Sequence, residues 1–179
     1  KRLGMLGAGL MGAGVAYVSA KAGMDVVLLD RDAAAAEKGK DYSRNLVKKG
    51  IERGKVSKEK GEALLERITT TSDYADLKDC DLIIEAVFEA DEIKKAVTEA
   101  TEAVIGKDIV FASNTSTLPI TGLAKNFTRP HQFIGIHFFS PVDKMPLVEI
   151  ILGEKTDDAT RALALDYVNQ IKKTPIVVN

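Results

Sequence analysis

Three glycines near the start of the chain, Gly7, Gly9 and Gly12, have the spacing of a dinucleotide-binding turn. They follow a short apolar run and precede a stretch that is compatible with a helix. In such a turn the first glycine permits a tight bend, the second lets a pyrophosphate approach the backbone, and the third lets the helix pack closely on the strand. The phosphates then lie at a helix N-terminus, where free N–H groups and the helix dipole favour an anion. The simpler alternative is a glycine-rich turn that binds no ligand.

An acidic residue lies where a dinucleotide site needs one to bind a ribose. A second apolar run ends at Asp30, which follows Gly7 by 23 residues. In dinucleotide-binding folds an acid about 20 residues after the turn hydrogen-bonds the ribose 2′-hydroxyl. Its charge repels a 2′-phosphate, although the adjacent Arg31 could accept one. We therefore expect NAD rather than NADP as the cofactor.

Two further residues could carry acid–base chemistry. His137 ends the apolar run 133–137, and Glu149 interrupts the apolar run 147–152. A carboxylate on a buried strand is costly unless it is paired, so we expect Glu149 to pair with His137. The pair would fix the tautomer of the imidazole and stabilise its protonated form. A histidine beside two phenylalanines can also be purely structural, and the residues alone leave that alternative open.

Small hydroxyl and amide residues follow another apolar run, at positions 113–117. At the carboxyl end of a strand they lie where open α/β sheets bind ligands. The same residue types are preferred caps at the start of a helix. Both roles can hold, because different residues of the run can take them.

The elements that must position these residues alternate along the chain. Short apolar runs, typical of buried parallel strands, occur at residues 3–6, 26–30, 82–86, 109–112 and 133–137. Helix-compatible stretches lie at residues 12–22, 33–50, 58–67, 91–105 and 118–125, and a strand, a helix and a strand follow at 147–152, 157–171 and 176–178. This alternation predicts an α/β fold: a doubly wound, mostly parallel sheet of the Rossmann type, with a helical hairpin after the second strand and extra C-terminal strands.

Composition narrows the class of protein. The 179 residues are 45% hydrophobic, which suits one domain with a buried core. A net charge of −1 does not favour non-specific binding of nucleic acid, and no apolar run is long enough to span a membrane. Residues 38–60 hold nine basic and three acidic residues. That excess could meet a phosphorylated ligand, and a solvated helix face is the simpler alternative.

Taken together, these motifs resemble the NAD-binding domain of the L-3-hydroxyacyl-CoA dehydrogenase family. The chain is most similar to the dehydrogenase segment of the multifunctional α-subunit of the fatty-acid oxidation complex. The similarity covers residues 1–179, and the stretches that carry it are 7–14, 82–89, 113–116, 137–142 and 146–150. It implies an oxidoreductase that transfers a hydride from C3 of an L-3-hydroxyacyl-CoA to NAD in β-oxidation, giving a 3-ketoacyl-CoA.

The resemblance also implies a role for individual residues. His137 would be the catalytic base, Glu149 its carboxylate partner, and Ser116 a catalytic contact to the substrate oxygen and the nicotinamide side. The implied cofactor contacts are Gly7, Gly9, Leu10, Met11, Gly12, Asp30, Val87, Phe88, Glu89, Lys94, Asn114, Ser116 and Ser140. The implied substrate contacts are Ser43 and Lys49 on the hairpin, together with Ser116. Many members have asparagine where this chain has Ser140, and no metal site is implied.

Further expectations concern the parent protein. Members of the family continue into a helical domain, expected after residue 179, that supplies an active-site asparagine and a dimerisation surface. The parent would bind an acyl-CoA, form an oligomer and could join a complex with a thiolase. It would be cytoplasmic in a bacterium and mitochondrial or peroxisomal elsewhere. Two alternatives remain: a non-catalytic or structural NAD-binding relative, and a β-hydroxy-acid dehydrogenase that acts on free acids.

Overall fold

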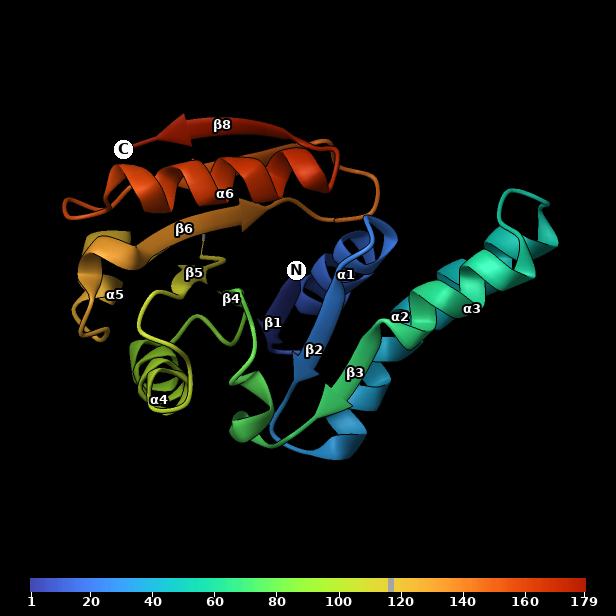
Figure 1. Ribbon diagram of the computed structural model, residues 1–179, viewed down its shortest axis with the longest axis horizontal. Coiled ribbons are helices and arrows are strands. Elements are labelled where there is room, and N and C mark those ends of the chain that lie inside the picture. The colour runs from blue at the N-terminus through green and yellow to red at the C-terminus, as the bar shows by residue number, and fades with distance from the viewer. Residues whose placement is uncertain (116–117) are drawn as a thin grey trace.

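An eight-stranded sheet forms the centre of the computed structural model, which describes residues 1–115 and 118–179 (Figure 1). The strands are β1 (Arg2–Leu6), β2 (Asp25–Leu29), β3 (Ile68–Thr71), β4 (Leu82–Glu85), β5 (Val110–Ser113), β6 (Phe133–Phe138), β7 (Leu147–Ile151) and β8 (Thr174–Val178). Their order across the sheet is β3-β2-β1-β4-β5-β6-β7-β8. Neighbours are parallel except β7, which runs antiparallel to β6. The mostly parallel sheet and the extra C-terminal strands are confirmed.

Helices cover both faces of this sheet. They are α1 (Leu10–Lys21), α2 (Ala33–Glu52), α3 (Lys58–Glu66), α4 (Asp91–Glu102), α5 (Ile120–Ala124) and α6 (Asp158–Gln170), with short 3-10 turns η1 (Tyr74–Leu77) and η2 (Pro130–Gln132). On one face, Val15 of α1 and Val168 of α6 belong to one apolar cluster. On the other face, Leu123 of α5 and Leu77 of η1 belong to a second cluster. Helices on both faces define the doubly wound arrangement.

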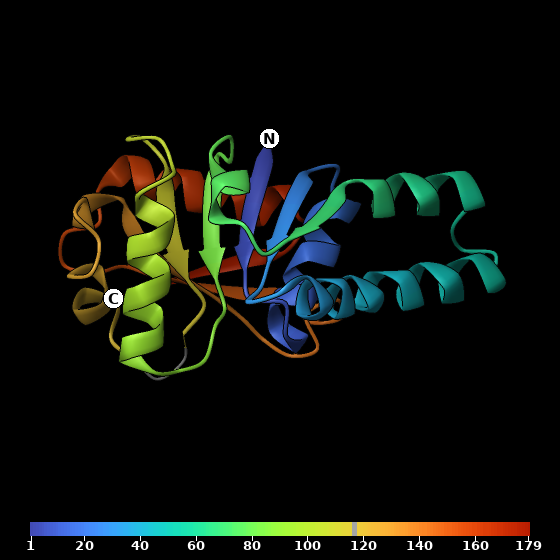
Figure 2. The ribbon, with the colours of Figure 1, turned by 90° about the horizontal axis from the view of Figure 1, so that it is seen from below.

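The helical hairpin predicted after the second strand is formed by α2 and α3. Figure 2 shows it extending away from the sheet, with the turn between the two helices farthest from the body. Asp32 caps α2 by accepting a hydrogen bond from the Ala35 N–H. Val47 of α2 and Leu64 of α3 are buried in the apolar cluster, so the base of the hairpin is held by the core.

One strand was not predicted. β3 has the sequence Ile-Thr-Thr-Thr and pairs in parallel with β2 at the edge of the sheet. Ile68 is its one buried residue. An edge strand with so little apolar surface has no apolar run for a sequence pattern to detect.

In the part of the chain that the structure describes, no helix is long and apolar enough to span a membrane.

Candidate active site

The strands β1, β2, β4, β5 and β6 all end at the same edge of the sheet, because they are parallel. The chain winds from β1 outward to β3, then returns to place β4 on the other side of β1. In open α/β sheets, ligands bind outside the carboxyl ends of the strands at such a reversal of strand order. The loops that follow these strands carry most of the predicted site residues.

The glycine turn after β1 has the geometry that a dinucleotide requires. Gly7 has φ +99°, and a Cβ on Gly12 would lie 1.8 Å from the Gly7 carbonyl oxygen. A Cβ on Gly9 would meet no described atom within 4 Å. Among the described residues no side chain caps α1, so the N–H groups of its first turn remain available to a ligand. The turn therefore fits a pyrophosphate, which would accept those hydrogen bonds.

Two predicted cofactor contacts, Leu10 and Met11, begin α1 directly after the turn. Leu10 is 66% exposed, whereas Met11 is half-buried against the core. Of the two side chains, that of Leu10 is the more accessible to a ligand.

Asp30 follows β2 and is tied to the glycine turn. Its Oδ2 accepts a hydrogen bond from the Ala8 N–H at 2.8 Å, and its Oδ1 accepts one from the Arg31 N–H at 2.6 Å. A carboxylate can accept about four hydrogen bonds, so capacity remains for a ribose hydroxyl. The Arg31 side chain is 80% exposed and its Nε lies 3.5 Å from Asp32. The turn and the acid, which are far apart in sequence, thus form one unit.

His137 and Glu149 are paired, as the sequence predicts. They are direct cross-strand partners in the antiparallel β6–β7 ladder, and His137 Nδ1 lies 3.0 Å from Glu149 Oε1. The side chains are 17% and 32% exposed. The Phe139 ring lies 4.8 Å from the imidazole ring, centroid to centroid. Since Nδ1 is engaged with the carboxylate, Nε2 is the ring nitrogen left to exchange a proton with a ligand.

The loop after β4 carries the predicted contacts Val87, Phe88 and Glu89. Phe88 is 78% exposed, and the Glu89 side chain is 38% exposed. Lys94, four positions into α4, is placed differently: its side chain is 1% exposed. Its Nζ lies 2.6 Å from Glu85 Oε2 and 3.6 Å from Glu89 Oε1. Lys94 thus contacts the loop through Glu89. Its contact with the cofactor stays a prediction.

Two predicted residues lie in the loops after β5 and β6. Asn114 is 8% exposed, and its Oδ1 accepts a hydrogen bond from the Phe138 N–H at 2.8 Å. This contact joins the ends of β5 and β6. Ser140 is exposed at the start of the loop between β6 and β7. Ser116 lies outside the described residues.

The two substrate contacts implied on α2 do not share a face of the helix. Ser43 is 1% exposed, and its Oγ has no hydrogen-bond partner among the described residues. Lys49 is exposed. The structure places these residues apart from each other, and their contact with CoA stays a prediction.

A buried carboxylate at the end of β4 was given no role by sequence reasoning. Glu85 is 1% exposed and binds Ser113 Oγ, Lys94 Nζ and the Val87 N–H. The sequence does indicate such a residue, because an acid that ends an apolar strand needs a partner. The same argument identified Glu149.

A Rossmann-type sheet, a glycine turn joined to an acid, and a His–Glu pair at the same edge define a nicotinamide-dependent dehydrogenase domain. The chain belongs to the 3-hydroxyacyl-CoA dehydrogenase family: the family model described as "3-hydroxyacyl-CoA dehydrogenase, NAD binding domain" matches residues 2–179. The predicted family and the NAD cofactor are thereby confirmed.

Individual relatives agree with this assignment. The chain is 49% identical over its full length to the fatty acid oxidation complex subunit alpha of Idiomarina loihiensis, of which it spans 25%. The structure resembles (S)-3-hydroxybutyryl-CoA dehydrogenase PaaH1 from Ralstonia eutropha (TM-score 0.96, 37% identity), covering 99% of this chain and 62% of that one. It also resembles 3-hydroxybutyryl-CoA dehydrogenase from Escherichia coli (TM-score 0.95, 32% identity), covering 99% of this chain and 38% of that one.

Proposed function

We propose that the protein reversibly oxidises an L-3-hydroxyacyl-CoA to the 3-ketoacyl-CoA, as one activity of a fatty-acid oxidation protein. The observation that carries this proposal is the His137–Glu149 pair at 3.0 Å, on the sheet edge that also holds the glycine turn. A second observation is the similarity to relatives whose names state this chemistry.

Each residue of the site has a separate proposed role in the reaction. NAD, when bound, supplies the hydride acceptor. The first turn of α1 would hold its pyrophosphate, and Asp30 would hold a ribose hydroxyl. His137 Nε2 takes the proton of the substrate hydroxyl as the hydride leaves C3. Glu149, on Nδ1, stabilises the imidazolium that results and keeps the ring in the required tautomer. Ser116 is proposed to hydrogen-bond the substrate oxygen.

The direct test is oxidation of NADH by the full-length protein in the presence of acetoacetyl-CoA. Consumption of NADH that depends on the thioester supports the proposal. Turnover of free acetoacetate instead would favour the free-acid dehydrogenase. Binding of NADH without turnover of either compound would favour a non-catalytic relative.

His137→Gln tests the assignment of the base. General base catalysis contributes about 10²–10⁴-fold, so kcat should fall by that order. The dissociation constant for NADH should be unchanged, because the glycine turn and Asp30 are untouched. Steady-state kinetics and a fluorescence titration of NADH measure the two quantities. A variant with the kcat of the unmodified protein would contradict the assignment.

The remaining proposals concern the whole protein. The chain spans a quarter of the curated relative, which is a subunit of a fatty acid oxidation complex. We propose that a helical domain follows residue 179, completes the active site and forms the oligomer, and that a thiolase is the partner in the complex. A cytoplasmic location is proposed because that relative is bacterial.

A further inference from the structure

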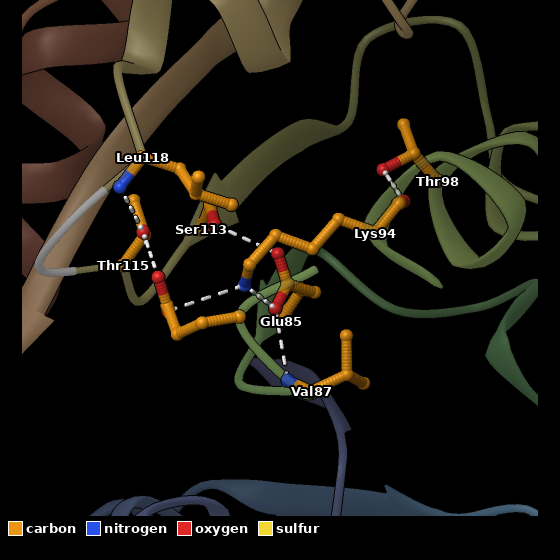
Figure 3. Close-up of polar contacts among 8 residues, drawn as sticks. Glu85, Val87, Lys94, Thr98, Ser113, Thr115 and Leu118 are labelled. Carbon is orange, nitrogen blue, oxygen red and sulfur yellow. Dashed lines mark hydrogen bonds and ion pairs between the residues drawn. The ribbon is translucent and has the colours of Figure 1, made fainter. Parts of the chain in front are cut away.

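Three groups converge on the buried carboxylate of Glu85 (Figure 3). Oε1 accepts a hydrogen bond from Ser113 Oγ at 2.7 Å. Oε2 accepts one from Lys94 Nζ at 2.6 Å and one from the Val87 N–H at 2.9 Å. The Glu85 carboxylate therefore joins the ends of β4 and β5, the start of the following loop, and α4.

The network continues through Lys94 to a second loop. Lys94 Nζ lies 3.6 Å from Glu89 Oε1, and Glu89 Oε2 accepts a hydrogen bond from Thr115 Oγ1 at 2.7 Å. Thr115 Oγ1 in turn accepts one from the Leu118 N–H at 3.1 Å. This chain of contacts spans the loop after β4 and the loop after β5, at the reversal of strand order where the cofactor is proposed to bind.

A contribution to stability alone does not account for the buried ion pair between Glu85 and Lys94. The side chains of Glu85 and Lys94 are each 1% exposed. Removing two charges from water costs nearly as much as their attraction returns, and apolar replacements of similar size are often as stable or more stable. What an apolar pair cannot supply is a set of directed hydrogen bonds to the Val87 N–H and Ser113 Oγ.

We propose that Glu85 is a positioning residue for the cofactor site. It holds Lys94 and Val87 directly, and through Lys94 and Glu89 it holds Thr115, so one buried carboxylate connects residues that follow β4 and β5. The inference rests on the proposed function only for the identity of the ligand that these loops face.

The test uses the full-length protein and two measurements, the dissociation constant for NADH and the thermal midpoint. Glu85→Gln keeps the size of the side chain but removes the charge and one acceptor. The dissociation constant should rise about tenfold, because side chains of the loops that are no longer held must be ordered when the cofactor binds. The thermal midpoint should fall, because the buried Lys94 then keeps only the more distant Glu89 carboxylate as a charge partner.

The double variant Glu85→Gln with Lys94→Met separates positioning from stability. It removes both buried charges, so the thermal midpoint should recover. The dissociation constant should stay raised, because the Val87 N–H and the Glu89 contact are no longer held. The single variant Lys94→Met measures the part of this rise that comes from Lys94 as a predicted cofactor contact. Recovery of both quantities would show a purely structural pair and overturn the proposal, as would normal NADH affinity in a folded Glu85→Gln variant.

Two further variants serve as a stability control and as a substitute for Glu85→Gln. Ser19→Ala removes another buried hydrogen bond, Ser19 Oγ to Tyr167 OH at 2.7 Å, away from the loops. It should lower the thermal midpoint and leave NADH affinity unchanged. If Glu85→Gln does not fold, Thr115→Val removes the contact with Glu89 and the hydrogen bond from the Leu118 N–H, and it should weaken NADH binding. Unchanged affinity in that variant would overturn the proposal. Because NADH binding is the readout, failure to turn over acetoacetyl-CoA would refute the proposed function and not this inference.

Discussion

At the scale of single residues, strand register explains the acid–base pair. His137 and Glu149 are 12 residues apart in sequence but face each other directly across the antiparallel ladder. Directly opposite residues have Cβ atoms about 5 Å apart, which suits a contact between an imidazole and a carboxylate. A shift of one residue in register would send the two side chains to opposite faces of the sheet. The geometry of the pair therefore depends on the whole β6–β7 ladder.

A methyl group at Gly9 should block the cofactor without disturbing the fold. Gly9→Ala places a Cβ in open space in front of α1, where the pyrophosphate is proposed to bind. We expect a large loss of NADH affinity and an unchanged thermal midpoint. Gly122→Ala is the matched control, since a Cβ there also meets no described atom within 4 Å and lies on α5. Equal NADH affinity in the two variants would argue against a phosphate site at this turn.

The sequence predicts local motifs better than it predicts the contacts of each side chain in the folded protein. The glycine spacing and the position of Asp30 are local patterns, and the turn has the predicted geometry. The burial of Lys94 is not local. A lysine on an amphipathic helix is usually exposed. Lys94 is buried because the fold brings α4 to the end of β4, where Glu85 accepts a hydrogen bond from its Nζ. Only the three-dimensional structure supplies that partner.

At the scale of elements, capping shows where local chemistry is sufficient. Asp157 precedes α6, and its Oδ1 accepts a hydrogen bond from the Thr160 N–H at 2.8 Å. Hydrogen bonds from Thr160 hold the pKa of the Asp157 carboxyl below its usual range. Such a cap can be predicted from sequence, and the helix was expected at 157–171. β3 could not be predicted in this way, because it exists through its pairing with β2.

Removal of this cap should have a defined pH dependence. Asp157→Ala should cost about 1 kcal/mol of unfolding free energy at neutral pH. Because the pKa is lower in the folded state, the stabilisation is present above the ordinary aspartate pKa of about 3.9 and is lost as pH falls through the folded value. Urea unfolding at neutral and strongly acidic pH measures this change.

Asp158→Ala is the control for that experiment, since Asp158 is exposed in the first turn and is not the cap residue. Its effect should be the smaller one, through the helix dipole. A cost of Asp157→Ala that is the same at both pH values would contradict the role of the carboxylate.

At the scale of the whole molecule, one of the two apolar clusters buries the single cysteine. Cys80 is 2% exposed and lies in the cluster that contains Leu77 and Ile83. Burial raises the pKa of the Cys80 thiol to about 12. The thiolate is the reactive form, so the folded protein should not react with a thiol reagent at mildly alkaline pH.

Labelling of Cys80 should therefore report unfolding. With increasing urea, modification of the Cys80 peptide, followed by mass spectrometry, should track the loss of circular dichroism. Saturating NADH should shift both transitions to higher urea, because it binds the folded state. Rapid labelling of Cys80 in the absence of urea would show that this cluster opens without global unfolding.

The outer strand of the sheet has a consequence for solubility. β8 ends the strand order, so one side of its backbone has no neighbour in the described sheet. A strand of another molecule can pair with such an unpaired edge. Ile176 in β8 is 42% exposed and adds apolar surface there. Pro175, within β8, has no N–H to donate and interrupts the template. In a concentrated solution, that missing donor helps to keep separate molecules from joining edge to edge into aggregates.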